Sequence, residues 1–390
     1  MIAYAEIRAL RAEWDLRDDV IEKDYVLGWM LAAIAAEPAL NDAWVFKGGT
    51  ALRKCYFETY RLSEDLDYTV IRGGPEEPAD LLPIFGRIQV WLVDRCGLEI
   101  VLDETAFRRG TNSRGRPTTQ GKIAYRGPRP TSQLPKLKID ITSDEVVVLP
   151  HAPRGILHPY SDAAGVAGSV ACYAFPELLA EKIRALAERC RPRDLYDVVH
   201  MFRHPDLVAR SAEVLAILQR KCAHAGIDVP DLAYLENSPF REEIRQEWAN
   251  MLAHQLPHLP PFEEFWSALG EVFAWLAGGA VVPLPSYPTR DVDATWTLPR
   301  SMSAWHAPFP LEMIRFAGAN RLKVEIDYRA EDGRWVPRVV EPYSLRRTRD
   351  GNLMLYVVND RGDLRSYGLD RIRGVRPTSQ PFIPRYIVEF

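Results

Sequence analysis

Asp65 and Asp67, separated only by Leu66, are the residue pair in this sequence best suited to chemistry. The segment 66–71 has the pattern of a β-strand, on which side chains alternate, so both carboxylates would share one face while Leu66 points into the core. Two like charges held this close are costly unless a cation neutralises them. Hard divalent ions such as Mg²⁺ take oxygen ligands and usually share them with substrate phosphates. The pair therefore predicts a Mg²⁺ site that acts on a phosphorylated substrate.

A third carboxylate would complete a two-metal site, and Asp140 is the candidate. It lies in the segment 137–142, where apolar and polar residues alternate as in a half-buried strand. Two ions that hold the attacking and leaving oxygens support in-line transfer of a phosphoryl or nucleotidyl group. The alternative is an exposed strand whose two aspartates are solvated.

Gly48, Gly49 and Thr50 form a second candidate site upstream of the aspartates. They follow a short strand expected at 45–46 and open an expected helix. This is the geometry of a phosphate cradle, because glycine lets the backbone approach closely and the N–H groups at a helix start favour an anion. The Thr50 hydroxyl would add one donor. Ser63 precedes the paired aspartates by two residues and is expected on the same strand face, where it would either bond nearby backbone or help to seat a triphosphate.

The hydrophobic periodicities predict an α+β fold that positions these residues. Helices are expected over 1–40, 50–60, 81–95 and 176–276, and strands over 45–46, 66–71 and 137–142. The segment 107–135 is rich in Arg, Gly, Pro and Thr, which predicts a loop or an irregular hairpin.

The composition is that of a globular protein, with 390 residues of which 47% are hydrophobic and 26% charged. A net charge of −4 does not indicate a polyanion-binding molecule as a whole, although a local basic patch would still allow nucleic acid to bind. The five cysteines are scattered without a CxxC pair, so neither a disulfide framework nor a zinc site is expected, and a reducing cytoplasm fits. The N-terminus is too charged for a signal peptide, and no membrane association is expected.

Proline marks the boundary between two expected domains. Nine of the 30 prolines fall within residues 257–310, and 280–308 has the composition of a linker. The expected domains are therefore 1–279 and 309–390. The second is β-rich, with alternating strands and Asp-Gly and Arg-Gly turn signals, and residues 311–390 hold fifteen Arg and Lys against eleven Asp and Glu.

The stretch FKGGTALRKCYFETYRLSEDLDY, residues 46–68, resembles the first motif of the AbiEii/AbiGii family of nucleotidyltransferase-like toxins, spacing included. VIEKDYVLGWML near the N-terminus and FEEFW near residue 265 also resemble that family, so the resemblance covers roughly residues 15–276. It implies a polymerase-β-like nucleotidyltransferase core with helical flanks. It also implies a Mg²⁺-dependent enzyme that moves a nucleotide from an NTP to a cellular acceptor, with tRNA as the suggested acceptor. The implied setting is a toxin–antitoxin or phage-defence system, where a cognate antitoxin would be a partner.

The family's later motif appears as ELLAEKIRALAERCRPRDLYDVVHM. The resemblance implies that Lys182 contacts nucleotide phosphates and that Asp194 supports the catalytic centre. The point charge of a lysine suits a triphosphate. As alternatives, Asp194 would be a helix cap, and Asp197, which is favourable in a first helical turn, is expected to be structural.

The C-terminal segments VVEPYSL, NLMLYVV and RSYGLDRIRGV resemble a WYL domain, a small Sm-like β-fold associated with ligand sensing or nucleic-acid binding. Where that family has Trp-Tyr-Leu, this chain has Leu353, Met354 and Leu355, so no ligand can be carried over. The alternative is a dimerisation or packing module.

Two other functions stay open at this level. A protein AMPylase would use the same transfer chemistry on a protein acceptor, and a WYL-type regulator would bind nucleotide without turnover. Positive residues within 108–138 would follow an RNA phosphate backbone, or would belong to a solvated loop. They are Arg108, Arg109, Arg114, Arg116, Lys122, Arg126, Arg129, Lys136 and Lys138.

Overall fold

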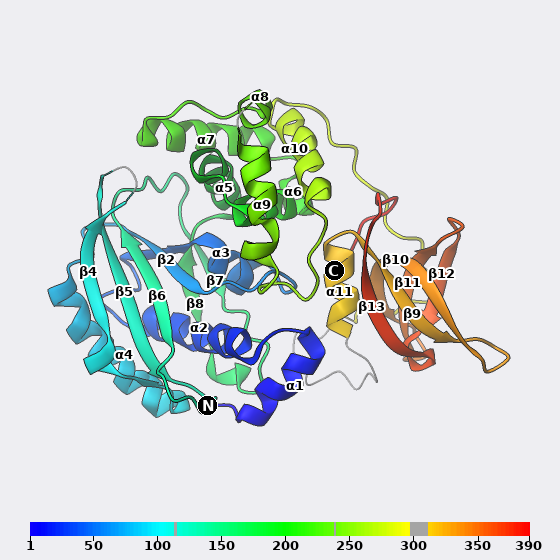
Figure 1. Cartoon of the computed structure of the whole chain (residues 1–390), viewed down its shortest axis with the longest axis horizontal. Coiled ribbons are helices and arrows are strands. Elements are labelled where there is room, and N and C mark those ends of the chain that lie inside the picture. The colour runs from blue at the N-terminus through cyan, green and yellow to red at the C-terminus, as the bar shows by residue number, and fades with distance from the viewer. Residues whose placement is uncertain (113–114, 238, 297–310) are drawn as a thin grey trace.

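The computed structural model describes residues 1–112, 115–237, 239–296 and 311–390. Figure 1 shows a large sheet, a group of helices and a smaller C-terminal sheet. The large sheet and most helices come from the N-terminal part of the chain, and the smaller sheet comes from its end. This architecture confirms the expected α+β fold class with a β-rich C-terminal part.

The large sheet has eight strands, in the order β3-β5-β6-β2-β1-β8-β7, with β4 also paired to β5. The strands are β1 (Trp44–Lys47), β2 (Asp65–Val70), β3 (Glu99–Ile100), β4 (Ala106–Thr111), β5 (Pro117–Arg126), β6 (Lys136–Thr142), β7 (Ala152–Gly155) and β8 (Ser169–Cys172). β2 pairs with β6 and β1 pairs with β8 in parallel, and the remaining pairs are antiparallel. The parallel β2–β6 pair matters most for the site because it aligns the two strands that carry the candidate carboxylates.

Helices cover this sheet and form a separate group beside it. They are α1 (Tyr4–Trp14), α2 (Asp18–Ala36), α3 (Gly48–Ala51), α4 (Pro78–Cys96), α5 (Phe175–Arg189), α6 (Pro192–Phe202), α7 (Ser211–Ala225), α8 (Leu232–Glu236), α9 (Phe240–Leu252) and α10 (Phe262–Leu276). α2 and α4 contact each other and strands of the large sheet. Figure 1 shows α5 to α10 gathered together, apart from α2 and α4. None of the helices in the described ranges is long and apolar enough to cross a membrane.

The C-terminal part consists of one helix and an antiparallel sheet of five strands in the order β12-β11-β10-β9-β13. Its elements are α11 (Leu311–Ala319), β9 (Leu322–Arg329), β10 (Trp335–Arg347), β11 (Leu353–Asn359), β12 (Leu364–Gly368) and β13 (Ile372–Pro381). Leu353, Met354 and Leu355, which replace Trp-Tyr-Leu, begin β11, and Leu355 is fully buried.

A buried interface joins the two parts of the chain. α11 contacts α1, and one hydrophobic cluster continues from the helices α5–α10 into the C-terminal sheet. Across this interface, the Tyr196 hydroxyl donates to Asn320 Oδ1 at 2.9 Å, and both residues are buried. Because polar and apolar contacts are both buried here, the interface favours one fixed arrangement of the two parts.

One expected helix differs from the structure, one segment with two open alternatives is settled by it, and one expected linker lies partly outside the described residues. The helix expected over 50–60 begins at Gly48, becomes a π-helix over Leu52–Tyr56 and ends there. For the segment 107–135, the structure decides between the alternatives of loop and hairpin, because β4 and β5 form an antiparallel hairpin. Of the expected linker 280–308, residues 297–308 lie outside the described residues.

Candidate active site

Asp65 and Asp67 lie on β2, beside the strand that carries Asp140. The β2–β6 register pairs Asp67 with Asp140 and Asp65 with Lys138. Leu66 is fully buried, whereas the aspartates are partly exposed, so the alternation expected for a half-buried strand is present. Neighbouring strands lie about 4.8 Å apart. The structure therefore brings the three candidate carboxylates to one face of the sheet.

These carboxylates disturb one another electrostatically. Burial, followed by the charges of Asp140 and Asp65, raises the pKa of Asp67 to about 6. Burial also raises the pKa of Asp65, where the Lys138 ammonium opposes the shift and Asp140 adds to it. Burial and the neighbouring carboxylates thus both disfavour the ionised aspartates, and a bound cation would stabilise them.

Asp140 has a resident partner in this structure. The Lys138 ammonium lies 2.7 Å from Asp140 Oδ2. Within the described part of the chain, no three His, Cys, Asp or Glu side chains are already gathered as a metal-ligand set. The oxygen donors are of the kind that Mg²⁺ takes, so the residue types fit a divalent cation. Lys138 occupies one oxygen of Asp140, so an ion held by all three aspartates binds the other oxygen or displaces the ammonium.

The glycine turn lies directly against Asp67. Gly48 has φ +80°, a conformation that favours glycine, and a Cβ at this position would lie 2.2 Å from Asp67 Oδ2. The buried Thr50 hydroxyl donates to the backbone carbonyl of Asp65, so its proton positions β2 and is not available to a phosphate. The turn and the strand are thus held as one unit.

Gly49 packs in the same way against the residues that precede β2. A Cβ at Gly49 would lie 2.3 Å from Arg61 Nη2 and 3.2 Å from Ser63 Oγ. Ser63 itself is buried and lies outside the strand, because β2 begins at Asp65. Ser63 therefore belongs to the glycine turn and not to the carboxylate strand on which it was expected.

Lys182 on α5 lies between two aspartates of α6. Its ammonium is 3.1 Å from Asp194 Oδ1 and 2.7 Å from Asp197 Oδ2, and both aspartates are fully buried. Burial would raise the pKa of Asp194, but Arg189 and Lys182 hold it well below its ordinary value. The Lys182 charge also lowers the pKa of Asp67, which places this lysine within electrostatic reach of the carboxylate face. Asp194 influences that face through Lys182 and Arg189, with which it is ion-paired.

Two cations near the aspartates were not recognised in the sequence. Burial would lower the pKa of Lys47, but the carboxylates of Glu145, Glu181 and Asp67 raise it. Lys47 pairs with Asp67 in the β1–β2 register, and its position next to the glycine turn is the signal that could have identified it.

Arg193 is the second such cation. It is the second residue of α6, next to Asp194, and its Nε is buried with no hydrogen-bond partner among the residues described. Burial and the Arg61 charge lower the pKa of Arg193, while Asp65 and Glu64 oppose that shift. No local pattern in the sequence indicates this placement, because it depends on where the tertiary structure puts the start of α6 relative to Asp65.

Three features of this site are those of a nucleotidyltransferase. A strand enters a glycine turn, a neighbouring strand runs parallel to β2, and paired carboxylates face the turn. A family model for the nucleotidyl transferase AbiEii toxin of type IV toxin–antitoxin systems matches residues 29–271. This range is more than half of the chain, which therefore belongs to the AbiEii toxin family. A model for the WYL domain matches residues 311–377. Both resemblances noted in the sequence are confirmed.

Two solved structures are similar in part. The nucleotidyltransferase toxin MenT4 from Mycobacterium tuberculosis is 18% identical with a TM-score of 0.47, over 71% of this chain and 90% of that one. The proteasome accessory factor PafBC of Arthrobacter aurescens is 19% identical with a TM-score of 0.18, over 44% of this chain and 21% of that one. At these values neither similarity carries functional information. A search of curated protein sequences found no match.

Proposed function

We propose that this AbiEii-family nucleotidyltransferase is a Mg²⁺-dependent toxin that transfers a nucleotide from an NTP to an RNA acceptor, with tRNA as the first candidate. The observation that carries the proposal is Asp67, which lies opposite Asp140 on a parallel strand and against Gly48. This arrangement puts negative charge next to the turn where a triphosphate would approach. A cognate antitoxin and the division into domains 1–279 and 309–390, joined by 280–308, are parts of the same proposal.

Each residue of the site has a proposed role. Asp65, Asp67 and Asp140 would hold Mg²⁺, which would neutralise the triphosphate and polarise its phosphorus. Gly48 and Gly49 let Asp67 and Arg61 pack against the turn, and Thr50 ties the turn to β2. The triphosphate would bind beside this turn, close to Ser63. An acceptor hydroxyl loses its proton to solvent as its oxygen bonds to the α-phosphorus, the bond from the α-phosphorus to the bridging oxygen of the β-phosphate breaks, and pyrophosphate leaves.

Lys182 and Asp194 act from α5 and α6. Lys182 is held by two aspartates, so its ammonium is a fixed positive charge close to Asp67 and suits the charge that develops on the phosphates. Asp194 is buried and ion-paired, so its role is to position Lys182 and Arg189. Lys47 and Arg193 supply further positive charge around the same face.

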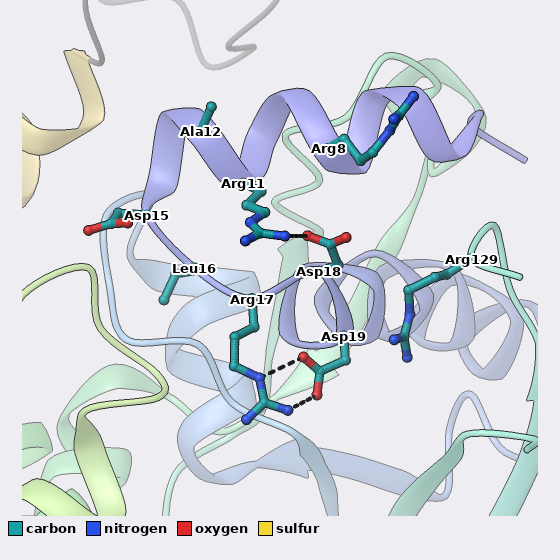
Figure 2. Close-up of a pocket in the computed structure, with 9 residues that line it drawn as sticks. All are labelled: Arg8, Arg11, Ala12, Asp15, Leu16, Arg17, Asp18, Asp19 and Arg129. Carbon is teal, nitrogen blue, oxygen red and sulfur yellow. Dashed lines mark hydrogen bonds and ion pairs between the residues drawn. The ribbon is translucent and has the colours of Figure 1, made fainter. Parts of the chain in front are cut away.

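An open, arginine-lined cavity supports a polyanionic acceptor. It has a volume of about 680 Å³ and lies between α1 and the start of α2, with Arg129 on its other side (Figure 2). Its positive residues are Arg8, Arg11, Arg17 and Arg129, and its acidic residues are Asp15, Asp18 and Asp19. Lys23 lies on α2, and its ammonium is 2.6 Å from the carboxylate of Glu64, the residue before Asp65. Arg8, Arg11 and Arg17 are exposed at this cavity, with Arg11 paired to Asp18 and Arg17 to Asp19, and exposed arginines suit a phosphate backbone.

The test is incubation of the full chain with each labelled NTP and with total RNA or total protein, with and without Mg²⁺. We expect label in the tRNA fraction, release of pyrophosphate, and loss of both in Asp65→Ala but not in Asp103→Ala, an exposed aspartate outside the site. Label in protein alone would replace RNA transfer by AMPylation. Nucleotide binding without pyrophosphate release would indicate a regulator and contradict the proposal.

Lys138 is expected to compete with Mg²⁺ for Asp140. In Lys138→Gln the ammonium that lies 2.7 Å from Asp140 is removed, so the carboxylate is free to bind the ion. We expect the Mg²⁺ concentration for half-maximal transfer to fall by about five-fold, the equivalent of one hydrogen bond or ion pair. Lys136→Gln, on the same strand but paired with Glu104, is the control and should leave the Mg²⁺ dependence unchanged. An unchanged or weaker Mg²⁺ response in Lys138→Gln would remove Asp140 from the metal site.

A further inference from the structure

The sheet face that carries the three aspartates continues beyond them onto β5 and β4. In the β5–β6 register, Lys138 lies opposite Lys122, and Asp140 lies opposite Gln120. In the β4–β5 register, Gln120 in turn lies opposite Arg108. Residues that lie directly opposite each other on neighbouring strands point to the same face of a sheet. Lys122 and Arg108 therefore share the face of Asp140.

This face of β4, β5 and β6 is open to solvent. Lys122 and Arg108 are exposed, whereas Ile123, which points to the other face of β5, is fully buried. On that other face, Phe107 of β4 packs against Phe85 of α4, with 4.9 Å between the ring centroids. Figure 1 shows α4 behind β4, with which it is in contact. The helix therefore covers the face opposite to the carboxylates.

Lys122 and Arg108 are free cations on the open face. Neither has an ion pair or a side-chain hydrogen bond among the residues that the structure describes. The other described cations between residues 108 and 138 all have acidic partners. These pairs are Arg109 with Glu76, Arg116 with Asp144, Arg126 with Glu99, Arg129 with Glu22, Lys136 with Glu104, and Lys138 with Asp140. The structure thus separates two unpaired cations from the larger set of positive residues in this segment.

The position of Lys122 opposite Lys138 indicates an anionic ligand. Like charges directly opposite each other on neighbouring strands destabilise a sheet. A charge often protects the free edge of a sheet, but β5 lies between β4 and β6, so this reason does not apply to Lys122. Lys138 is paired with Asp140, which leaves the charge of Lys122 without compensation. A phosphate bound at Lys122 would supply the missing negative charge.

The geometry of the transfer reaction indicates which phosphate this is. In-line displacement places the attacking and leaving oxygens on opposite sides of the phosphorus. The glycine turn follows β1, which borders β2 on one side, while β6 borders β2 on the other. A triphosphate at the turn therefore has its leaving pyrophosphate on the β1 side, and the acceptor hydroxyl approaches from the β6 side. Lys122 and Arg108 lie further along that side, on β5 and β4.

We propose that the open face of β4, β5 and β6 binds the sugar–phosphate backbone of the RNA acceptor. Lys122 and Arg108 bind its phosphates, and the attacking hydroxyl lies beside Asp140. Contacts to phosphates position a strand without reading its bases, so these two residues hold the acceptor in place and do not select its sequence. The direction of approach rests on the proposed transfer reaction, whereas the binding of RNA to this face is measured without it.

The test is the binding of fluorescein-labelled bulk tRNA to the full chain without NTP, measured by fluorescence anisotropy at several salt concentrations. Lys122→Gln and Arg108→Gln should each weaken binding about five-fold. Each should also reduce the slope of log Kd against log salt by about 0.7–0.9, the share of one phosphate contact. Lys122→Arg keeps the charge and should bind like the wild type. Arg95→Gln removes an exposed cation of α4, behind the sheet, and is the matched control that should leave binding unchanged.

Thermal melts and steady-state kinetics separate binding from folding. Because Lys122 lies opposite Lys138, Lys122→Gln should melt at the same temperature as the wild type or higher. In the transfer assay, the KM for tRNA should rise about five-fold in Lys122→Gln and Arg108→Gln, while the KM for NTP stays unchanged.

The outcomes for the surface and for the reaction are distinguishable. The surface proposal is overturned if both variants bind tRNA as tightly as Arg95→Gln, if binding is lost only in a variant that melts below the wild type, or if the wild type binds no tRNA. Transfer to tRNA that both variants retain at the wild-type KM would overturn the surface and leave the reaction standing. A wild type that binds tRNA through Lys122 and Arg108 but releases no pyrophosphate would support the surface and contradict the reaction.

Discussion

Replacement of Asp67 by asparagine should reduce nucleotide transfer by about 10²–10³-fold, the size of effect seen when one preorganised electrostatic group is removed. Asparagine has nearly the same shape, so the packing of Gly48 against this side chain is kept while the charge is lost. The measurement is the rate of pyrophosphate release at saturating NTP and Mg²⁺. Asp103→Asn, on an exposed 3₁₀ turn, is the matched control and should transfer at the wild-type rate.

The same variant should not be less stable than the wild type near neutral pH. The pKa of Asp67 is raised to about 6 in the folded state, so the folded chain holds this proton more tightly than the unfolded chain, whose value is about 3.9. The stability contributed by the protonated group is complete below about pH 4 and is lost as the pH rises through about 6. Above that pH, ionised Asp67 destabilises the wild type by about 1–3 kcal/mol relative to a neutral side chain.

We therefore expect Asp67→Asn to melt at an equal or higher temperature than the wild type at pH 8, with the difference disappearing near pH 4. Thermal melts of both proteins across this pH range measure it. A variant that keeps full transfer activity would remove Asp67 from the metal site. If Asp67→Asn melts below the wild type at pH 8 but not at pH 4, its partners hold Asp67 as an anion in the folded protein.

Removal of Asp197 should cause the largest loss of stability among the residues near the site. Its carboxylate accepts from Arg61 Nε at 2.7 Å and Nη2 at 2.8 Å, lies 2.7 Å from Lys182 Nζ, and also accepts from the Tyr60 hydroxyl. Arg61 is only 2% exposed, so Asp197→Ala leaves a buried guanidinium without its carboxylate. Breaking a buried ion pair in this way costs about 3–5 kcal/mol.

Urea denaturation, followed by circular dichroism, measures this effect. Asp206→Ala is the matched control, because that aspartate is 73% exposed on its side chain, and substitutions at such positions change stability by about 0.5 kcal/mol or less. If Asp197→Ala unfolds at the wild-type urea concentration and yet loses transfer activity, Asp197 belongs to the catalytic machinery and not to the scaffold.

Local patterns in the sequence were sufficient for part of the site. The alternation around Leu66 predicted that Asp65 and Asp67 share a strand face, because the two-residue period of a strand is a local property. Gly48 was recognised because glycine lets the backbone approach closely, and the structure adds that Gly48 has φ +80°, a conformation that favours glycine. The helix expected over 50–60 ends early at Tyr56, because the chain must leave the helix before Tyr60 and Arg61 can reach Asp197.

The sequence by itself therefore predicted the α+β fold class, the strand that carries the paired aspartates and the face that they share. The tertiary structure alone decided that Asp140 lies opposite Asp67, that Lys138 occupies its carboxylate, and that Lys182 is clamped between two aspartates. It also decided that α1 contacts α11. These contacts join segments far apart in the chain, so they depend on strand register and helix packing, which no local hydrophobic period encodes.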